Sequence, residues 1–200
     1  MKLYYTPGAC SLAVHIVAEE AGIALELEKV DLRHKRTESG ADFLAINDKG
    51  YVPALVLDDG SLMTEVAALL MYVADRKPEA KLAPAAGSLS HYRALESLCY
   101  IAGEVHKNIG GLFTASADAR EPLMANAARR LDRVARTLEK QDYLLADGYS
   151  VADAYLFVVL GWAPMVKFDL SPWPALKAYS ARIAGRPAVQ RALRREGLIS

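Results

Sequence analysis

The amino-acid sequence predicts an α/β domain followed by an all-α helical domain. The hydrophobic period changes several times over the first third of the chain, a linker-like run follows, and no strand pattern occurs beyond that run. The chain has 200 residues, 52% of them apolar and 24% charged, which is sufficient for two small globular cores. We place the first domain at residues 1–78, the linker at 79–87 and the helical domain at 88–200.

The order of elements in the first domain predicts a thioredoxin-like fold. Thr6, Pro7 and Gly8 interrupt the first strand, and Gly22 is a suitable residue to end the first helix. The predicted elements are a strand at 2–5, a helix at 12–21, strands at 25–32, 53–57 and 61–63, and a helix that Glu65 opens. A βαβ unit, a loop and then a ββα unit make up the thioredoxin-like order.

The rest of the chain shows only helical patterns. We expect helices at 88–113, 122–141, 151–165, 174–184 and 187–195. Ser150 to Asp153 read as a capping box directly before an apolar run, which predicts the start of a helix.

Composition excludes several classes of protein. The 24 basic and 24 acidic side chains balance, so no global field attracts the chain to nucleic acid or to a membrane surface. The longest apolar stretch, 151–166, contains Asp153 and Pro164 and reads as a buried helix. The chain begins without a signal-peptide pattern, and its two cysteines favour a reducing, cytoplasmic setting. No residues have the spacing of a metal site.

Cys10 is the first candidate for chemistry. It lies where a strand turns into a helix, and the helix N-terminus there favours an anion, so we expect a thiolate with a lowered pKa. Ala13 stands where a second cysteine would make a dithiol motif, which argues against two-cysteine redox chemistry. The alternative is that Cys10 is a small buried apolar residue.

Three further segments contain candidate binding residues. Pro53, between a loop and a strand, can be held cis, which would turn the backbone of Val52 outward to a peptide-like ligand; without further context a trans bond is the default. Glu65 either caps a helix or accepts a ligand ammonium while the first helical amides hold a carboxylate. His106, in the middle of a long helical stretch, is either a structural histidine or part of a site.

Together these segments resemble the bacterial beta-class glutathione transferases over essentially the whole chain. The motifs that carry the resemblance are Tyr4-Tyr5-Thr6-Pro7-Gly8-Ala9-Cys10-Ser11, Gly50-Tyr51-Val52-Pro53-Ala54-Leu55, Leu62-Met63-Thr64-Glu65, Glu104-Val105-His106-Lys107, Ser150-Val151-Ala152-Asp153 and Asp169-Leu170-Ser171-Pro172-Trp173-Pro174. Each motif is weak alone, but their order and spacing together are specific. The resemblance implies the glutathione transferase fold, a homodimer, and a glutathione site between the two domains. Together with the position of Pro53 between a loop and a strand, it predicts a cis Val52–Pro53 peptide bond.

The resemblance also implies roles for individual residues. Cys10 faces the glutathione sulfur, and Lys35 pairs with the glycyl carboxylate. The other implied glutathione-binding residues are Val52, Pro53, Glu65, Val66, Gly103, Glu104 and His106, and His106 joins Cys10 as a catalytic candidate. An apolar cleft with Leu112, Phe113 and Trp162 would take the electrophile. Val66 stands where the family usually has Ser and Cys99 where it commonly has Asn, and both replacements weaken the expected binding.

Three functions fit these expectations. The leading one is transfer of glutathione to small, largely apolar electrophiles in detoxification, with glutathione as co-substrate and no metal. The second is glutathione thiol exchange or reductive dehalogenation that depends on Cys10. The third is a non-catalytic module that binds glutathione or apolar ligands, which Val66 and Cys99 favour. The sequence names no physiological electrophile, because apolar cleft walls discriminate weakly.

Overall fold

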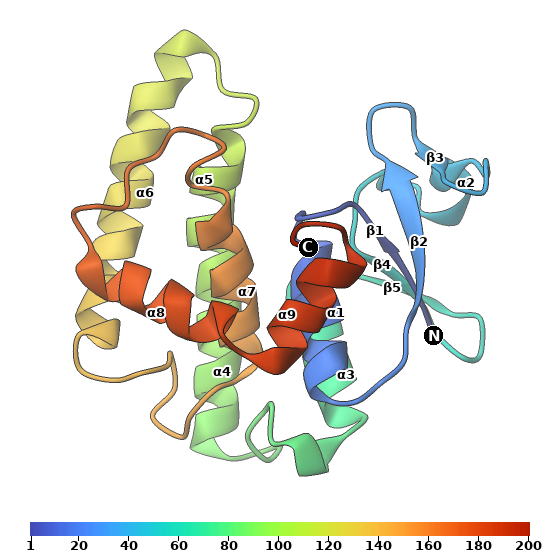
Figure 1. Ribbon diagram of the computed structural model, residues 1–200, viewed down its shortest axis with the longest axis horizontal. Coiled ribbons are helices and arrows are strands. Elements are labelled where there is room, and N and C mark those ends of the chain that lie inside the picture. Colours follow the sequence, from blue (N-terminus) through green and yellow to red (C-terminus); the bar gives the residue numbers. More distant parts are fainter. The chain divides into compact units, whose positions relative to one another are not determined.

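The chain folds into two compact units, which the computed structural model describes for all residues from 1 to 200 (Figure 1). One unit contains residues 1–82 together with 187–200, and the other contains residues 83–186. We describe each unit separately.

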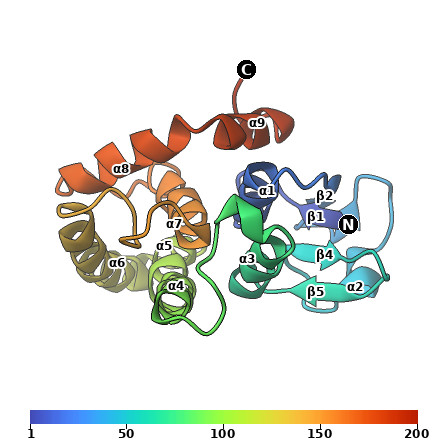
Figure 2. The same cartoon turned by 90° about the horizontal axis from the view of Figure 1, so that it is seen from below.

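The first unit is built on a mixed sheet with the strand order β3-β2-β1-β4-β5. β1 runs parallel to β2 and antiparallel to β4, which confirms the thioredoxin-like fold. In Figure 2, α1 and α3 lie on one face of the sheet and α2 on the other. The elements are β1 (Lys2–Tyr5), α1 (Ser11–Glu20), β2 (Glu26–Asp31), β3 (Arg36–Thr37), α2 (Phe43–Ile46), β4 (Ala54–Val56), β5 (Leu62–Thr64), α3 (Val66–Asp75), a 3-10 turn at Pro78–Ala80, and α9 (Pro187–Arg195).

The apolar residues of this unit explain its layers. α1 is buried along almost its whole length, from Ser11 to Ala18, because sheet and helices surround it. On the other face of the sheet, Tyr4, Phe43 and Val52 pack into one buried cluster, which fixes α2 and the start of β4 against β1. β1 and α1, which flank the turn that contains Cys10, are therefore both packed in the hydrophobic core.

The second unit is entirely helical. It contains α4 (Leu89–Tyr100), a π-helical stretch η2 (Ile101–His106), α5 (Lys107–Gly111), α6 (Ala117–Leu138), α7 (Val151–Gly161) and α8 (Pro174–Ala184). The first three follow one another without a break and correspond to the single helix expected at 88–113. α6 begins at Ala117 rather than at residue 122, and it accommodates Pro122 inside its N-terminal part. α7 ends at Gly161, four residues earlier than the expected 165.

The C-terminal helix differs from the expected domain division. The sequence analysis assigned 187–195 to the helical domain, but α9 belongs to the first unit and packs on α1. The two views agree that α9 lies beside α1 (Figures 1 and 2). The reason is chemical: its arginines and Glu196 find partners on α1 and on the turn before it, and these partners are not visible as a sequence pattern.

No helix is long and apolar enough to cross a membrane. The apolar stretch that begins at Val151 forms α7, of which Val151 to Leu156 are buried within the helical unit. No group of three or more His, Cys, Asp and Glu side chains is arranged to hold a metal ion.

The predicted capping box at the start of α7 is present. Asp153 is fully buried, and its carboxylate accepts hydrogen bonds from the Ser150 amide at 2.8 Å and the Leu144 amide at 2.9 Å. The hydroxyls of Ser150 and Tyr179 also donate to this carboxylate, both at 3.0 Å. Burial raises the pKa of Asp153, and these hydrogen bonds oppose that shift. One side chain thus links the loop before α7, the helix start and α8.

Replacing Asp153 with Ala is expected to lower the free energy of unfolding by about 3 kcal/mol or more, because it leaves several buried donors without an acceptor. Urea denaturation followed by circular dichroism measures the loss. Asp169 is a matched control, since its carboxylate also accepts from a nearby amide, at Ser171, but is exposed. Asp169→Ala should cost no more than about 1 kcal/mol; equal losses in the two variants would contradict the assigned role of Asp153.

Candidate functional site

The turn between β1 and α1 presents Cys10. Gly8 has a positive φ of 72°, a conformation that favours glycine, and Cys10 is the residue that caps α1. The hydroxyl of Thr6 donates to the Val30 carbonyl at 2.8 Å, and the Ala9 amide donates to the Thr6 carbonyl at 3.0 Å. These bonds fold the turn tightly, so that the Cys10 side chain lies at the beginning of the helix.

The thiol of Cys10 donates a hydrogen bond to the backbone carbonyl of Val52, with 3.3 Å between Sγ and O. These residues are 42 positions apart, and the sequence analysis chose each independently. The Val52–Pro53 peptide bond is cis, as predicted. The structure therefore brings the first two predicted segments together.

The expected lowering of the Cys10 pKa is wrong. Burial raises the pKa of Cys10 to about 12, and the backbone amides of Cys10 and Ser11 only partly offset that effect. The charge of Glu65 raises it further. Helix-terminal amides do favour a thiolate, but the sequence could not show that the loss of hydration is the larger effect. Cys10 is a neutral thiol, a hydrogen-bond donor rather than an anion.

Glu65 lies at the start of α3 in a strained backbone conformation. Its φ is 72°, which a residue with a side chain adopts only where the surroundings enforce it, and such strain is concentrated at functional sites. The next residue, Val66, is buried and is the first residue of α3. The amides of this first turn have no partner within the helix, which makes them suitable for an anion.

The carboxylate of Glu65 is held by two neighbours that the sequence analysis did not select. One oxygen accepts from Lys49 Nζ at 2.8 Å and from the Tyr51 hydroxyl at 2.8 Å. These hydrogen bonds lower the pKa of Glu65, so it is a carboxylate at neutral pH. Lys49 also donates to the Thr64 hydroxyl at 2.8 Å. An ammonium group therefore already occupies the acceptor that a ligand ammonium would use.

Lys35 is anchored close to the same segment. Its Nζ donates to the Gly50 carbonyl at 2.6 Å, and its own backbone has a positive φ of 54°. Pro53, which follows Val52, is buried and has no backbone N–H to donate. Lys35 thus lies near the loop that leads to Val52, and its ammonium donates a hydrogen bond to a neutral carbonyl there.

The helical unit places His106 among aromatic rings. Its ring meets those of Trp162 and Tyr155 edge to face, with centroids 4.7 and 5.8 Å apart, and Nδ1 lies 2.7 Å from the Tyr155 hydroxyl. Burial, helped by the charge of Lys107, lowers the pKa of His106 to about 4. His106 is therefore neutral at physiological pH.

The other candidates in this unit differ in exposure and contacts. Glu104 forms an ion pair with Arg130 at 2.6 Å, and Gly103 is exposed one position earlier.

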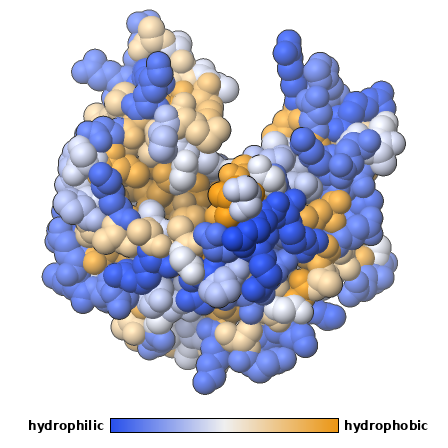
Figure 3. Space-filling view, viewed as in Figure 1, coloured by the Kyte–Doolittle hydropathy of each residue, from blue (hydrophilic) through white to orange (hydrophobic).

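Apolar surface gathers over α5 and the segment that follows α7 (Figure 3). A cavity of about 320 Å³ lies there, lined by Leu112, Phe113, Arg120, Met165, Val166 and Lys167. Trp162 is not on its wall but supports Phe113, at 6.0 Å between ring centroids.

Two kinds of residue escaped the sequence analysis. Tyr51 lies inside a selected motif, next to Val52, and its hydroxyl could have been proposed as a partner for Glu65. Tyr155, Met165 and Lys167 carry no sequence signal, because helix packing alone brings them to His106 or to the cavity.

Comparisons with known proteins cover both units. Residues 8–76 match the glutathione S-transferase N-terminal domain, and residues 68–187 match the glutathione S-transferase C-terminal domain. The chain is 44% identical to glutathione S-transferase GstA of Escherichia coli O157:H7, over 99% of this chain and 100% of that protein. Two solved structures are similar: BphK, a bacterial glutathione S-transferase in a ternary complex (TM-score 0.97, 52% identity, 98% and 100% of the two chains), and a sphingomonad glutathione S-transferase complexed with glutathione (TM-score 0.95, 45% identity, all of both chains).

The raised pKa of Cys10 predicts how its alkylation depends on pH. The thiolate is the reactive form, so in a Cys99→Ser background the iodoacetamide rate should keep rising through pH 10 without a plateau near 8.5. Mass spectrometry of quenched samples measures this rate. The same protein in urea is the control, and its rate should level off above about pH 8.5. A plateau below pH 8 in the folded protein would show a stabilised thiolate and contradict this assignment.

Proposed function

The chain belongs to the glutathione S-transferase family, and we propose that it transfers glutathione to small, largely apolar electrophiles. The observation that carries the proposal is the hydrogen bond between Cys10 and the Val52 carbonyl, at 3.3 Å. It joins the two segments that the resemblance assigns to the cysteinyl part of glutathione. A ligand thiol placed beside Cys10 would then meet a neutral hydrogen-bond donor.

We propose that the first unit binds glutathione, whose ammonium competes with Lys49 for Glu65. Glu65 accepts the ligand's ammonium, and the amide of Val66 binds the adjacent carboxylate at the α3 N-terminus. The backbone of Val52, set by Pro53, pairs with the cysteinyl part, and the ammonium of Lys35 attracts the glycyl carboxylate. Gly103, Glu104 and His106 stay predicted contributors from the helical unit.

In the proposed reaction the thiol of glutathione loses its proton to solvent water. The sulfur then forms a bond to an electrophilic carbon, and the leaving group departs with the bonding electron pair. The Cys10 thiol has one proton, so on ligand binding it would turn from the Val52 carbonyl and donate instead to the thiolate, which favours that form of the ligand. His106 is neutral at this pH, so it would add no charge to the reaction. The apolar electrophile would lie beside Leu112 and Phe113, in a cavity whose wall also contains the basic side chains of Arg120 and Lys167.

The alternative in which Cys10 itself attacks a disulfide is disfavoured. The nucleophile in thiol exchange is a thiolate, and a pKa of about 12 leaves almost none at neutral pH. Val66 and Cys99 are the sequence features that favour a purely non-catalytic module, but the contact between Cys10 and Val52 and the family membership of the chain favour a transferase.

Glutathione binding tests the proposal through the ammonium acceptor. Glu65→Gln removes the charge and should weaken binding by about tenfold, since hydrogen bonds to charged groups contribute about 1.5–3 kcal/mol. Lys49→Met removes the internal ammonium that occupies Glu65, and should tighten binding by about two- to fivefold, the range of an exposed ion pair. Titration calorimetry measures both affinities, and an assay with an aryl halide measures transfer.

The two variants are matched, because each breaks the same 2.8 Å ion pair from one side. Damage to the loop alone would weaken binding in both. Opposite effects support a ligand ammonium on Glu65. A parent protein that neither binds glutathione nor transfers it to the aryl halide would refute the proposed function.

We further propose a homodimer that acts in cytoplasmic detoxification. α4 exposes Leu89 and Tyr92, 72% and 59% accessible, and Cys99 is exposed on the same helix. Exposed apolar side chains along one helix are typical of a surface that another chain covers. Neither cysteine forms a disulfide, which is compatible with a reducing compartment.

Light scattering at micromolar concentration tests the assembly. We expect twice the 21.7 kDa mass of one chain, and a shift toward the monomer when Leu89 and Tyr92 are both replaced with Asp, because charged side chains are costly in a buried interface. The control replaces Met165, which is 71% exposed outside α4, with Asp. A monomeric parent, or equal dissociation in both variants, would contradict this assembly.

A further inference from the structure

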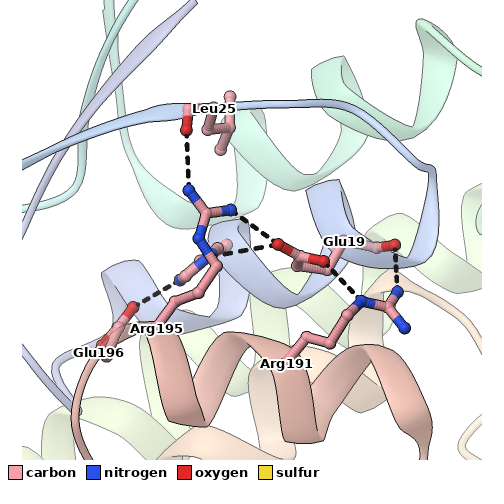
Figure 4. Close-up of polar contacts among 6 residues, drawn as sticks. Glu19, Leu25, Arg191, Arg195 and Glu196 are labelled. Atoms are coloured by element: carbon pink, nitrogen blue, oxygen red, sulfur yellow. Dashed lines mark hydrogen bonds and ion pairs between the residues drawn. The ribbon is translucent and has the colours of Figure 1, made fainter.

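The C-terminal segment is attached to α1 by ion pairs. Glu19 on α1 accepts from Arg191 Nε at 2.8 Å and from Arg195 Nη1 at 2.7 Å (Figure 4). The same arginines donate to the backbone carbonyls of Glu19 and Leu25. The outer face of α9 is hydrophilic (Figure 3). The ion pairs of Arg191 and Arg195 with Glu19 hold the opposite face of this helix against α1.

Glu196, directly after α9, is the buried member of this contact. Its side chain is 0% accessible, and one carboxylate oxygen lies 3.0 Å from Nδ1 of His15, which is also 0% accessible. The other oxygen accepts the Gly8 amide at 3.0 Å. A buried carboxylate is retained only where its oxygens have partners, and one of these partners belongs to the turn that presents Cys10.

The Gly8 contact is reinforced by packing. A Cβ at Gly8 would lie 3.5 Å from a methyl carbon of Leu198, so the last residues of the chain cover this turn. On its other side the turn is held by the Thr6 bond to Val30 and by the Cys10 bond to Val52. Removing the Glu196 carboxylate would take away the hydrogen bond that ties the Gly8 amide to the C-terminal segment.

We infer that Glu196 is a positioning residue for Cys10: by holding the Gly8 amide it fixes the turn that places the thiol on the Val52 carbonyl. The C-terminal helix is then part of the glutathione-binding unit, although the sequence places it more than 170 residues away from Cys10. The relevance to catalysis rests on the proposed function, whereas the positioning of the thiol can be measured without glutathione.

Alkylation of Cys10 tests the inference in a Cys99→Ser background. In Glu196→Ala the turn should loosen and the thiol become accessible, and iodoacetamide at pH 8.5 should react about tenfold faster. Glu196→Gln retains an oxygen acceptor for Gly8 and should stay within about twofold of the parent. Arg191→Ala is the matched control: it weakens the attachment of α9 but leaves Glu196 in place, and should also stay within about twofold.

Glu196→Asp replaces the Ala variant if that variant does not fold. It keeps the charge but is too short to reach both Gly8 and His15, and it should accelerate alkylation in the same direction. Parent-like alkylation in a folded Ala or Asp variant, or equal acceleration in Arg191→Ala, would overturn the inference. A second measurement uses glutathione: kcat/KM should fall in Glu196→Ala and be restored in Glu196→Gln. If the parent transfers no glutathione, the proposed function fails, while the alkylation rates still decide the role of Glu196.

Discussion

The hydrogen bond from the Cys10 thiol to the Val52 carbonyl is the contact on which the candidate site depends. It connects the turn after β1 with the loop before β4, and these strands pair directly in the sheet. The same contact is compatible only with a protonated sulfur, because a thiolate has no proton to donate. Position and chemical state of Cys10 therefore follow from one arrangement: a thiol at a helix start that burial keeps neutral.

A neutral thiol limits what Cys10 can do in the proposed transfer reaction. Stabilisation of a ligand thiolate needs donors that stay protonated while the ligand loses its proton. Cys10 stays protonated at neutral pH, and its one proton would have to turn from the Val52 carbonyl to the ligand sulfur. His106, with a pKa of about 4, adds no positive charge in the helical unit. Charge is instead concentrated around Glu65, where Lys49 holds the carboxylate at 2.8 Å. In the first unit, the charged groups at Glu65 suit the charged end of the ligand, whereas Cys10 suits its sulfur.

The element order and most boundaries could be predicted from the sequence, because turn residues and hydrophobic period are local signals. The helices at 174–184 and 187–195 and the capping box at Ser150 are examples. Local signals also identified Cys10, Val52 and Glu65. They could not show the pKa of Cys10, which depends on how much water the fold removes from the thiol. They also could not assign α9 to the first unit, since that depends on Glu196 meeting Gly8 and His15 across the length of the chain.

Backbone amide shifts in an NMR titration with reduced glutathione test the central claim most directly. The account predicts that the largest shifts in the first unit occur at Val52 and Val66, with Cys10 and Ser11 affected and residues of the exposed Asp58–Gly60 turn unchanged. Oxidised glutathione, which has no free thiol, is titrated at the same concentration. Shifts that only reduced glutathione causes then mark the residues near the ligand thiol. Saturable shifts confined to other parts of the chain, or no shifts at millimolar glutathione, would contradict the account.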